Sequence, residues 1–203
     1  GGNFIWHRIE EVLLLDEKGK AIKSIGRALD IDDEKKAMAL LEARSQIDSG
    51  SGLCNKNATE LYIKRCLKED PEGWHAMVVL DIDEFKSIND SKGHLYGDQV
   101  IADLADVLKS QFRASDILGR IGGDEFMVFI RDIPNELFVA VKIAKIRNTI
   151  MKMHQTGISA GIAIFPKDGK TYVELYKHAD MAMYSVKKKG KSGFEFFVDM
   201  IKH

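Results

Sequence analysis

The sequence AMVVLDIDEF, residues 76–85, passes from five consecutive apolar residues into a cluster of carboxylates. A continuous apolar run of this length predicts a buried strand, and we expect the strand to cover Ala76–Ile82. Alternation along a strand places Asp81 and Asp83 on one face and Ile82 on the other. Ligands collect at the carboxyl ends of strands in α/β folds, so these carboxylates indicate a site for Mg²⁺ and substrate phosphates. Alternatively, Asp83 and Asp90 cap the turn and the next helix, and for Asp90 we favour this interpretation.

The sequence around this strand alternates between helix and strand patterns. The predicted helices cover 58–68, 97–111, 135–153 and 172–188, and the other predicted strands cover 117–121, 125–130, 157–165 and 194–198. Two of these strands form a hairpin that turns at Gly122-Gly123, because glycine tolerates positive φ. Strands separated by helices, with one hairpin, predict an α/β (α+β mixed) domain whose helices flank a central mixed sheet.

The composition restricts the class of protein. The chain has 203 residues, of which 45% are apolar and 30% charged, enough for a sizeable core and too apolar for overall disorder. Its 30 basic and 31 acidic residues argue against a protein that coats a nucleic acid polymer. Two cysteines make no disulfide framework, and no apolar run is long enough to span a bilayer. We therefore expect a cytoplasmic domain, whether or not the full-length protein is membrane-anchored.

The first 48 residues have a different pattern. Residues 1–31 read as a small β-rich piece, with strands over Glu11–Leu15 and Ala21–Ile25. A single hairpin is not stable alone in water, so we interpret this piece as the tail of a truncated domain. Residues 32–48 predict a connecting helix with a narrow apolar stripe, although an ordinary surface helix fits equally well. The main domain is expected over residues 49–203.

Two more clusters carry possible chemistry. Gly122-Gly-Asp-Glu-Phe126 fits a tight hairpin turn, and its glycines would also let a nucleotide approach the backbone. Lys187-Lys-Lys-Gly-Lys191 fits a solvated helix end or, alternatively, a phosphate site. A P-loop is excluded because the glycine five residues before Gly190-Lys-Ser192 is missing. The histidine spacing gives no zinc motif.

Gly122-Gly-Asp-Glu-Phe126, together with Asp81-Ile-Asp-Glu-Phe-Lys86 and Asn89-Asp90, strongly resembles the GGDEF family of diguanylate cyclases over about residues 48–203. Further matching motifs are Gly52-Leu-Cys-Asn55, Gly93-His94 with Gly97-Asp98, Ser159-Ala-Gly-Ile-Ala163, and Ala179-Asp-Met-Ala-Met-Tyr184 with Lys187. Several motifs in family order are far more specific than the five-residue word alone.

The resemblance implies an activity, a cofactor and an assembly. Such enzymes have a palm-like fold similar to nucleotidyl cyclases and polymerases. They condense two GTP molecules into cyclic di-GMP and release two pyrophosphates. Each domain holds one GTP, so the active form is a homodimer, with two Mg²⁺ (or Mn²⁺) ions per active half-site.

The resemblance also implies a role for individual residues. Asp81 and Asp124 would bind metal through carboxylates, and Ile82 through its carbonyl. Asp124 or Glu125 would help to deprotonate the attacking 3′-hydroxyl, and Lys86 is assigned to the catalytic group beside the triphosphate. The residues implied to bind substrate are Phe85, Gly122 and Gly123 at the triphosphate, Asn89 and Asp98 at guanine, His94 behind the guanine loop, and Lys187 and Lys191 at the outer phosphates.

Two regulatory features follow in the same way. Arg113-Ala-Ser-Asp116, followed by Arg120, has the spacing of the family's Arg-x-x-Asp site, at which cyclic di-GMP inhibits its own synthesis. Residues 4–47 weakly resemble the last strands and exit helix of a PAS sensory domain, which implies an upstream sensor in the full-length protein. One departure is Asp48-Ser-Gly-Ser51, where the family usually has Asp-Pro-Leu-Thr.

Two other functions remain as alternatives. One is a catalytically silent module that binds GTP or cyclic di-GMP and passes a signal to a partner, and the intact Asp124 and Glu125 argue against it. The other is a cyclase that makes a 3′,5′-cyclic mononucleotide, and the guanine-type Asn89 and Asp98 argue against that.

Overall fold

The computed structural model describes residues 5–36 and 46–198. The chain divides into two compact units, residues 1–45 and residues 46–203, and each is treated separately. Among the described residues, none of the helices combines the length and the apolar character needed to cross a bilayer.

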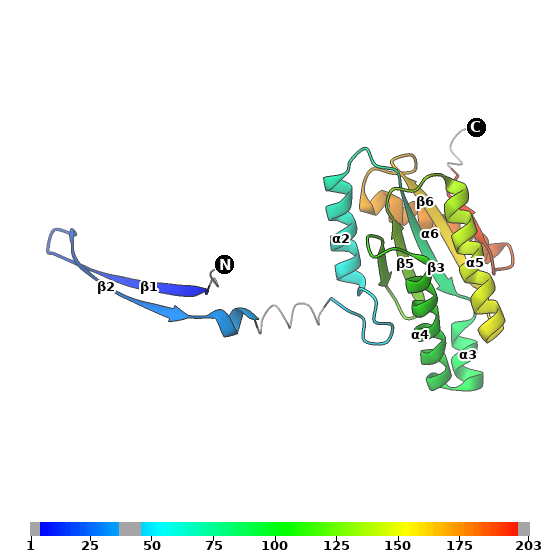
Figure 1. The fold of residues 1–203 in the computed structure, drawn as a ribbon, viewed down its shortest axis with the longest axis horizontal. Helices are drawn as coiled ribbons and strands as arrows, with labels where there is room; N and C mark the ends of the chain where they lie inside the picture. Colours follow the sequence, from blue (N-terminus) through cyan, green and yellow to red (C-terminus); the bar gives the residue numbers. More distant parts are fainter. Residues whose placement is uncertain (1–4, 37–45, 199–203) are drawn as a thin grey trace. The chain divides into compact units, whose positions relative to one another are not determined.

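The larger unit is built on a five-stranded sheet with the order β4-β5-β3-β6-β7 (Figure 1). The strands are β3 (His75–Ile82), β4 (Ile117–Arg120), β5 (Glu125–Ile130), β6 (Ile158–Phe165) and β7 (Phe194–Phe196). The central strand β3 pairs antiparallel with both β5 and β6, and β7 pairs parallel with β6. The predicted central mixed sheet is therefore confirmed.

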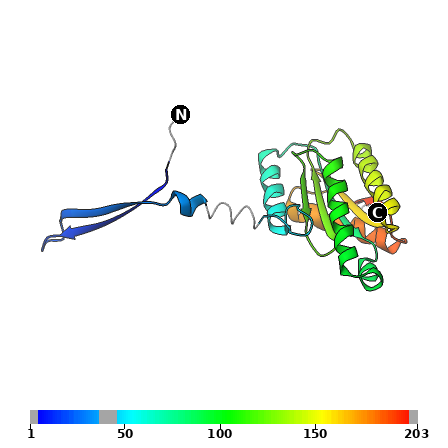
Figure 2. The same ribbon diagram turned by 60° about the horizontal axis from the view of Figure 1, so that its bottom comes forward.

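Helices cover both faces of this sheet (Figure 1; Figure 2). They are α2 (Lys56–Glu69), α3 (Phe85–Lys92), α4 (His94–Gln111), α5 (Glu136–His154) and α6 (Tyr172–Lys188). Alternate residues of β3 serve the two faces: Val78 and Leu80 pack with α4 and α5, whereas Met77 and Val79 pack with α2 and α6. Burial on both faces explains why this strand is a continuous apolar run.

The ends of the long helices follow from local chemistry. Asn55, Asn135 and Thr171 each accept a hydrogen bond from a backbone N–H in the first turn of α2, α5 and α6. Gly190, at φ +113°, follows the end of α6 as predicted. The helix α3 was not predicted, because it has only eight residues and none of them is fully buried.

The smaller unit contains the antiparallel hairpin of β1 (His7–Leu15) and β2 (Ala21–Asp30), both longer than predicted. Asp16 closes its turn by accepting from the backbone N–H groups of Lys18 and Lys20, both at 2.9 Å. Gly19 adopts φ +78° in the same turn. Every residue of β1 is exposed, in agreement with a hairpin that has no core of its own.

The predicted connecting helix over 32–48 is helical at residues 32–36, and residues 37–45 lie outside the described part of the chain. Its predicted end is wrong. Ile47 forms a β-bridge with Cys54, and the Asp48 backbone N–H donates to the Leu53 carbonyl at 2.8 Å. These contacts fold residues 46–54 onto the larger unit as a turn.

Candidate active site

The pairing of β3 with β5 assembles the predicted metal-binding residues. Asp81, the penultimate residue of β3, is buried and lies opposite Glu125, the first residue of β5. The Ile82 backbone N–H donates to the Asp124 carbonyl at 3.2 Å. One carboxylate from β3 and one from β5 therefore lie together at the carboxyl end of β3, which is where the sequence predicted a ligand site.

Electrostatics at this position favour a bound cation. Burial raises the pKa of Asp81, Lys187 opposes that rise, and the charges of Asp124 and Glu125 add to it. Lys187 Nζ lies 2.6 Å from Asp81 Oδ2. The single positive charge of this lysine faces the three negative charges of Asp81, Asp124 and Glu125. Hard oxygen donors with excess negative charge fit a divalent cation such as Mg²⁺ or Mn²⁺.

The two lysines predicted for the outer phosphates form ion pairs at this end of the sheet. Lys187 comes from the last turn of α6 and contacts Asp81. Lys191 Nζ lies 2.6 Å from a carboxylate oxygen of Glu84, in the loop that follows β3. Both cations therefore lie beside the carboxylate cluster, where an incoming triphosphate would compete for them.

The glycine turn is shaped by Arg120. The Nε and Nη2 groups of Arg120 donate to the Gly123 carbonyl at 3.1 and 2.7 Å, and Nη1 lies 3.1 Å from Asp48 Oδ1. Neither Gly122 nor Gly123 has positive φ, which corrects our reason for glycine at this turn. A Cβ on Gly122 would lie 2.8 Å from a Glu125 carboxylate oxygen, which is the movable end of a side chain, and Gly123 has open space around it.

The proposed guanine residues lie on a helical hairpin. Asn89 is half-buried on α3, and Asp98 is exposed on α4. A Cβ on Gly97 would collide with the Asn89 side-chain oxygen, so Asn89 lies directly against α4. Phe85 approaches the same glycine at 3.2 Å from the Cβ position, and the exposed His94 begins α4. The exposed Lys86 is on the first turn of α3.

The three residues assigned to product inhibition differ in their exposure and in their contacts. Arg113 is exposed, and its Nη2 donates to the Arg131 carbonyl at 2.7 Å. The Asp116 side chain is 2% exposed and accepts from the backbone N–H groups of Arg113 and Arg131. Arg120 is committed to Gly123 and Asp48. In this structure Asp116 and Arg120 organise loops, and Arg113 offers the exposed guanidinium.

The role of Asp83 was only partly foreseen. Ser159 Oγ and the Ser192 backbone N–H donate to its two carboxylate oxygens at 2.6 and 2.8 Å. Thr156 Oγ1 donates to its carbonyl at 2.9 Å. Asp83 therefore ties two segments, residues 156–159 and the loop at Ser192, to the end of β3. No sequence pattern indicated these partners, which are more than 70 positions away.

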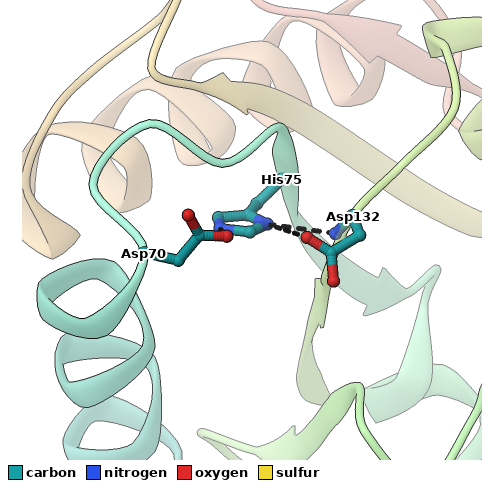
Figure 3. Close-up of side chains that lie close together, drawn as sticks. All are labelled: Asp70, His75 and Asp132. Carbon is teal, nitrogen blue, oxygen red and sulfur yellow. Dashed lines mark hydrogen bonds and ion pairs between the residues drawn. The ribbon is translucent and has the colours of Figure 1, made fainter.

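A second acidic cluster lies at the opposite end of β3 (Figure 3). The Asp132 backbone N–H donates to His75 Nδ1 at 3.1 Å, so Nδ1 accepts and Nε2 carries the proton. Nε2 lies 3.4 Å from Asp70 Oδ2, on the other side of the ring from Asp132 (Figure 3). Because Nδ1 accepts from the backbone and the whole side chain is buried, we interpret His75 as a structural histidine, although its Nε2 makes no hydrogen bond to the described residues.

Comparisons with known proteins identify relatives of this chain. Residues 45–193 match the family model described as "Diguanylate cyclase, GGDEF domain". The chain is 30% identical over 201 residues to the probable diguanylate cyclase DgcE of Escherichia coli, covering 94% of this chain and 18% of that protein. It is 29% identical over 159 residues to the diguanylate cyclase DgcS of Shewanella oneidensis, covering 76% of this chain and 54% of that protein.

Solved structures give the same fold. The coiled coil and GGDEF domain of DgcB from Caulobacter crescentus, in complex with c-di-GMP, superposes with a TM-score of 0.74 at 23% identity. That match covers 82% of this chain and 93% of the other. The GGDEF domain of TpbB (YfiN) from Pseudomonas aeruginosa gives a TM-score of 0.67 at 30% identity, over 75% and 94% of the two chains. The chain spans only 18% of the length of DgcE.

Proposed function

Because the chain belongs to the family of GGDEF-domain diguanylate cyclases, we propose that it condenses two GTP molecules into cyclic di-GMP and releases two pyrophosphates. The observation that supports this most is the convergence of Asp81, Asp124 and Glu125 beside the open Gly122-Gly123 turn. Nucleotidyl transfer from GTP requires such a carboxylate cluster next to backbone that a nucleotide can approach.

The metal-binding residues in this proposal are Asp81, Asp124 and the carbonyl of Ile82. Bound Mg²⁺ or Mn²⁺, with two ions proposed per half-site, would polarise the α-phosphate and make the 3′-hydroxyl more acidic. The buried Asp81, with its raised pKa, gains from pairing its charge with a cation. Lys187 supplies part of that compensation in the structure and becomes available to the outer phosphates when a cation replaces it.

The bond changes are an in-line displacement that takes place twice. The 3′-oxygen of one GTP forms a bond to the α-phosphorus of the other, and the bond to pyrophosphate breaks. Asp124 or Glu125 accepts the proton of the 3′-hydroxyl. Lys86, Phe85, Gly122 and Gly123 surround the triphosphate in this proposal, and Lys187 and Lys191 neutralise the leaving group.

Guanine recognition is assigned to the α3–α4 hairpin. The Asp98 carboxylate is exposed and accepts from the N1–H and N2–H₂ edge of guanine, which adenine does not have. Asn89 adds a second contact, and His94 supports the loop. One domain holds one GTP, so the proposal requires a homodimer in which two domains face each other.

The direct test is incubation of concentrated protein with GTP and Mg²⁺, followed by chromatography and mass spectrometry. We expect cyclic di-GMP from the wild type and at least about a hundredfold less from Asp124→Ala, because metal charge stabilisation is worth several kcal/mol. Asp106→Ala, at an exposed position on α4, is the control and should retain full activity. Failure of a dimerised wild type to form any product, while it still bound cyclic di-GMP, would favour the silent binding module.

We also propose that the product inhibits synthesis through Arg113. The side chain of Arg113 is 58% exposed, and the buried Asp116 holds this segment in place by accepting from the Arg113 N–H. An exposed arginine can grip a phosphate or guanine with two parallel hydrogen bonds. That Asp116 and Arg120 also contact the product directly remains a prediction.

Arg113→Ala should raise the inhibition constant for cyclic di-GMP by tenfold or more, about 1.4 kcal/mol, with initial rates unchanged in the absence of product. The measurement is the cyclase rate at increasing cyclic di-GMP, with Lys145→Ala as a control at an exposed position on α5. An unchanged inhibition constant would contradict this assignment.

A further inference from the structure

The α3–α4 hairpin carries both residues proposed to read guanine. The helix α4 is anchored in the core by Val100, Ile101 and Leu104, whereas α3 has little packing of its own. No residue of α3 is fully buried, and neither helix has a side-chain cap at its N-terminus. Gly93, at φ +85°, joins the two helices. Short helices gain most of their stability from tertiary contacts. The position of α3, and so of Asn89 relative to Asp98, therefore depends on the contacts that hold the hairpin to its neighbours.

Tyr96, on the first turn of α4, contacts His154 at the end of α5. Tyr96 Oη lies 3.2 Å from His154 Nδ1, and the two rings meet edge to face with centroids 5.7 Å apart. His154 Nε2 lies 2.9 Å from Asp103 Oδ2, and Gln99 donates to the other oxygen of Asp103. The His154 side chain is only 6% exposed. A buried imidazole that uses both nitrogens has a fixed orientation.

The chemistry of the partners sets the direction of each hydrogen bond. The Asp103 carboxylate only accepts, so His154 Nε2 carries the proton. In the neutral imidazole Nδ1 then accepts, and the Tyr96 hydroxyl donates to it. Lys92, the last residue of α3, lies with its Nζ 3.4 Å from Tyr96 Oη and 4.4 Å from the ring centroid. The series Lys92, Tyr96, His154 and Asp103 therefore connects both helices of the hairpin to α5.

The residues that follow His154 hold the strand end next to the metal site. Thr156 Oγ1 donates to the Asp83 carbonyl at 2.9 Å, and the Asp83 N–H donates to the Gly157 carbonyl at 3.0 Å. Asp83 is two positions after Asp81. One short segment, residues 154–157, thus contacts both the α3–α4 hairpin and the end of β3.

We propose that His154 is a positioning residue for guanine recognition. Oriented by Asp103, it holds Tyr96 and so fixes Asn89 and Asp98 relative to the metal-binding end of β3. The inference rests on the proposed cyclase function. His154 acts through Tyr96 and touches no substrate, so its loss affects GTP affinity and base discrimination more than the turnover of bound GTP.

The first test is Tyr96→Phe, which removes one hydroxyl and keeps the ring. We expect the KM for GTP to rise roughly fivefold, the value of one lost hydrogen bond, with kcat little changed. The preference for GTP over inosine triphosphate, which has no 2-amino group, should fall as well. Tyr62→Phe is the matched control, because Tyr62 on α2 donates its hydroxyl to Gln46 at 2.6 Å, and its kinetics should not change.

The second test separates the two nitrogens of His154. His154→Asn keeps an acceptor near the Nδ1 position and so keeps a partner for Tyr96, whereas His154→Gln places its amide near Nε2. The proposal predicts a smaller rise in KM for Asn than for Gln. A purely structural role predicts that KM in both variants follows the loss of stability, which thermal unfolding measures.

The outcomes separate this inference from the cyclase proposal. If the wild type makes cyclic di-GMP and Tyr96→Phe has unchanged KM and base preference, the inference is wrong and the cyclase proposal stands. If the wild type makes no product, calorimetric binding of a non-hydrolysable GTP analogue replaces kinetics. Weaker binding by Tyr96→Phe then supports the inference alone, equal binding overturns it, and no binding by the wild type overturns both.

Discussion

Asp81 and Asp83 lie two residues apart, and the structure gives them opposite tasks. Burial raises the pKa of Asp81, and the charges of Asp124 and Glu125 add to the rise, although Lys187 at 2.6 Å opposes it. Asp83 has both carboxylate oxygens occupied by protein donors, Ser159 Oγ and the Ser192 N–H. Of the two carboxylates, Asp81 would therefore gain more from a bound cation, in line with its proposed metal-binding role.

His75 is the residue whose titration should affect folding most clearly. Burial lowers its pKa, the carboxylates of Asp70 and Asp132 oppose this, and Arg131 adds to the lowering. Below pH 6.5, which is the ordinary pKa of histidine, the unfolded chain binds the proton more readily than the folded chain. The free energy of unfolding should therefore fall as pH drops from 6.5 toward the lowered pKa, by at most about 1.4 kcal/mol per pH unit.

The measurement is urea unfolding at a series of pH values for the wild type and His75→Gln. The variant loses ring contacts with Phe129 and Phe165, so its absolute stability is lower, but its pH slope over this window should be shallower. His94→Gln, at an exposed position, is the control. Parallel slopes for wild type and His75→Gln would contradict the account.

The positions of the motif residues could be predicted from the sequence because each motif lies within one short segment. The residues that they contact could not be predicted. Asp81 ends an apolar run, and that alone indicated its position. The contacts of Asp83 with Ser159, and of Arg120 with Asp48, join residues 76 and 72 positions apart. No spacing rule encodes such pairs, because they depend on which strands become neighbours.

At the scale of elements, the turn of residues 48–53 connects the beginning of the larger unit to the Gly122-Gly123 turn. Asp48 Oδ1 accepts from the Ser51 N–H and Oγ, both at 2.8 Å, and from Arg120. Arg120 in turn donates to the Gly123 carbonyl. Gly50 leaves room for the guanidinium, since a Cβ there would lie 2.6 Å from Arg120 Nη1.

Asp48→Ala should lower the free energy of unfolding by about 1–3 kcal/mol, because it leaves a largely buried arginine and the Ser51 donors unpaired. Chemical denaturation measures this directly. Asp106→Ala, whose side chain is 75% exposed, should change stability by less than about 0.5 kcal/mol. Equal effects of the two substitutions would show that the Asp48 contacts add nothing.

The long helices and buried strands were predictable because periodicity and caps act within one segment. The predicted helix over 172–188 agrees with α6 at both ends. The helix α3 escaped prediction because Phe85 and Ile88, its apolar residues, are only partly buried. The end of the predicted 32–48 helix was wrong because its last residues pair with Cys54 across a turn.

For the whole molecule, the family match to residues 45–193 lies almost entirely within the larger unit. The assignment of residues 1–31 to a PAS-like sensor, and an upstream sensor as partner, stay predictions. The exposed apolar residues of β1 and β2 agree with a hairpin that belongs to a larger core. The proposed reaction needs two GTP molecules held by two domains, so we expect association of the larger unit to limit activity at low concentration.

The most direct test of the central claim is the initial rate of cyclic di-GMP formation, per mole of protein, over a wide range of protein concentration with GTP and Mg²⁺. The account predicts that this specific activity rises with concentration as domains pair and then levels off, and that Asp124→Ala stays inactive throughout. Absence of cyclic di-GMP at every concentration, even after fusion to a dimeric coiled coil, would contradict it.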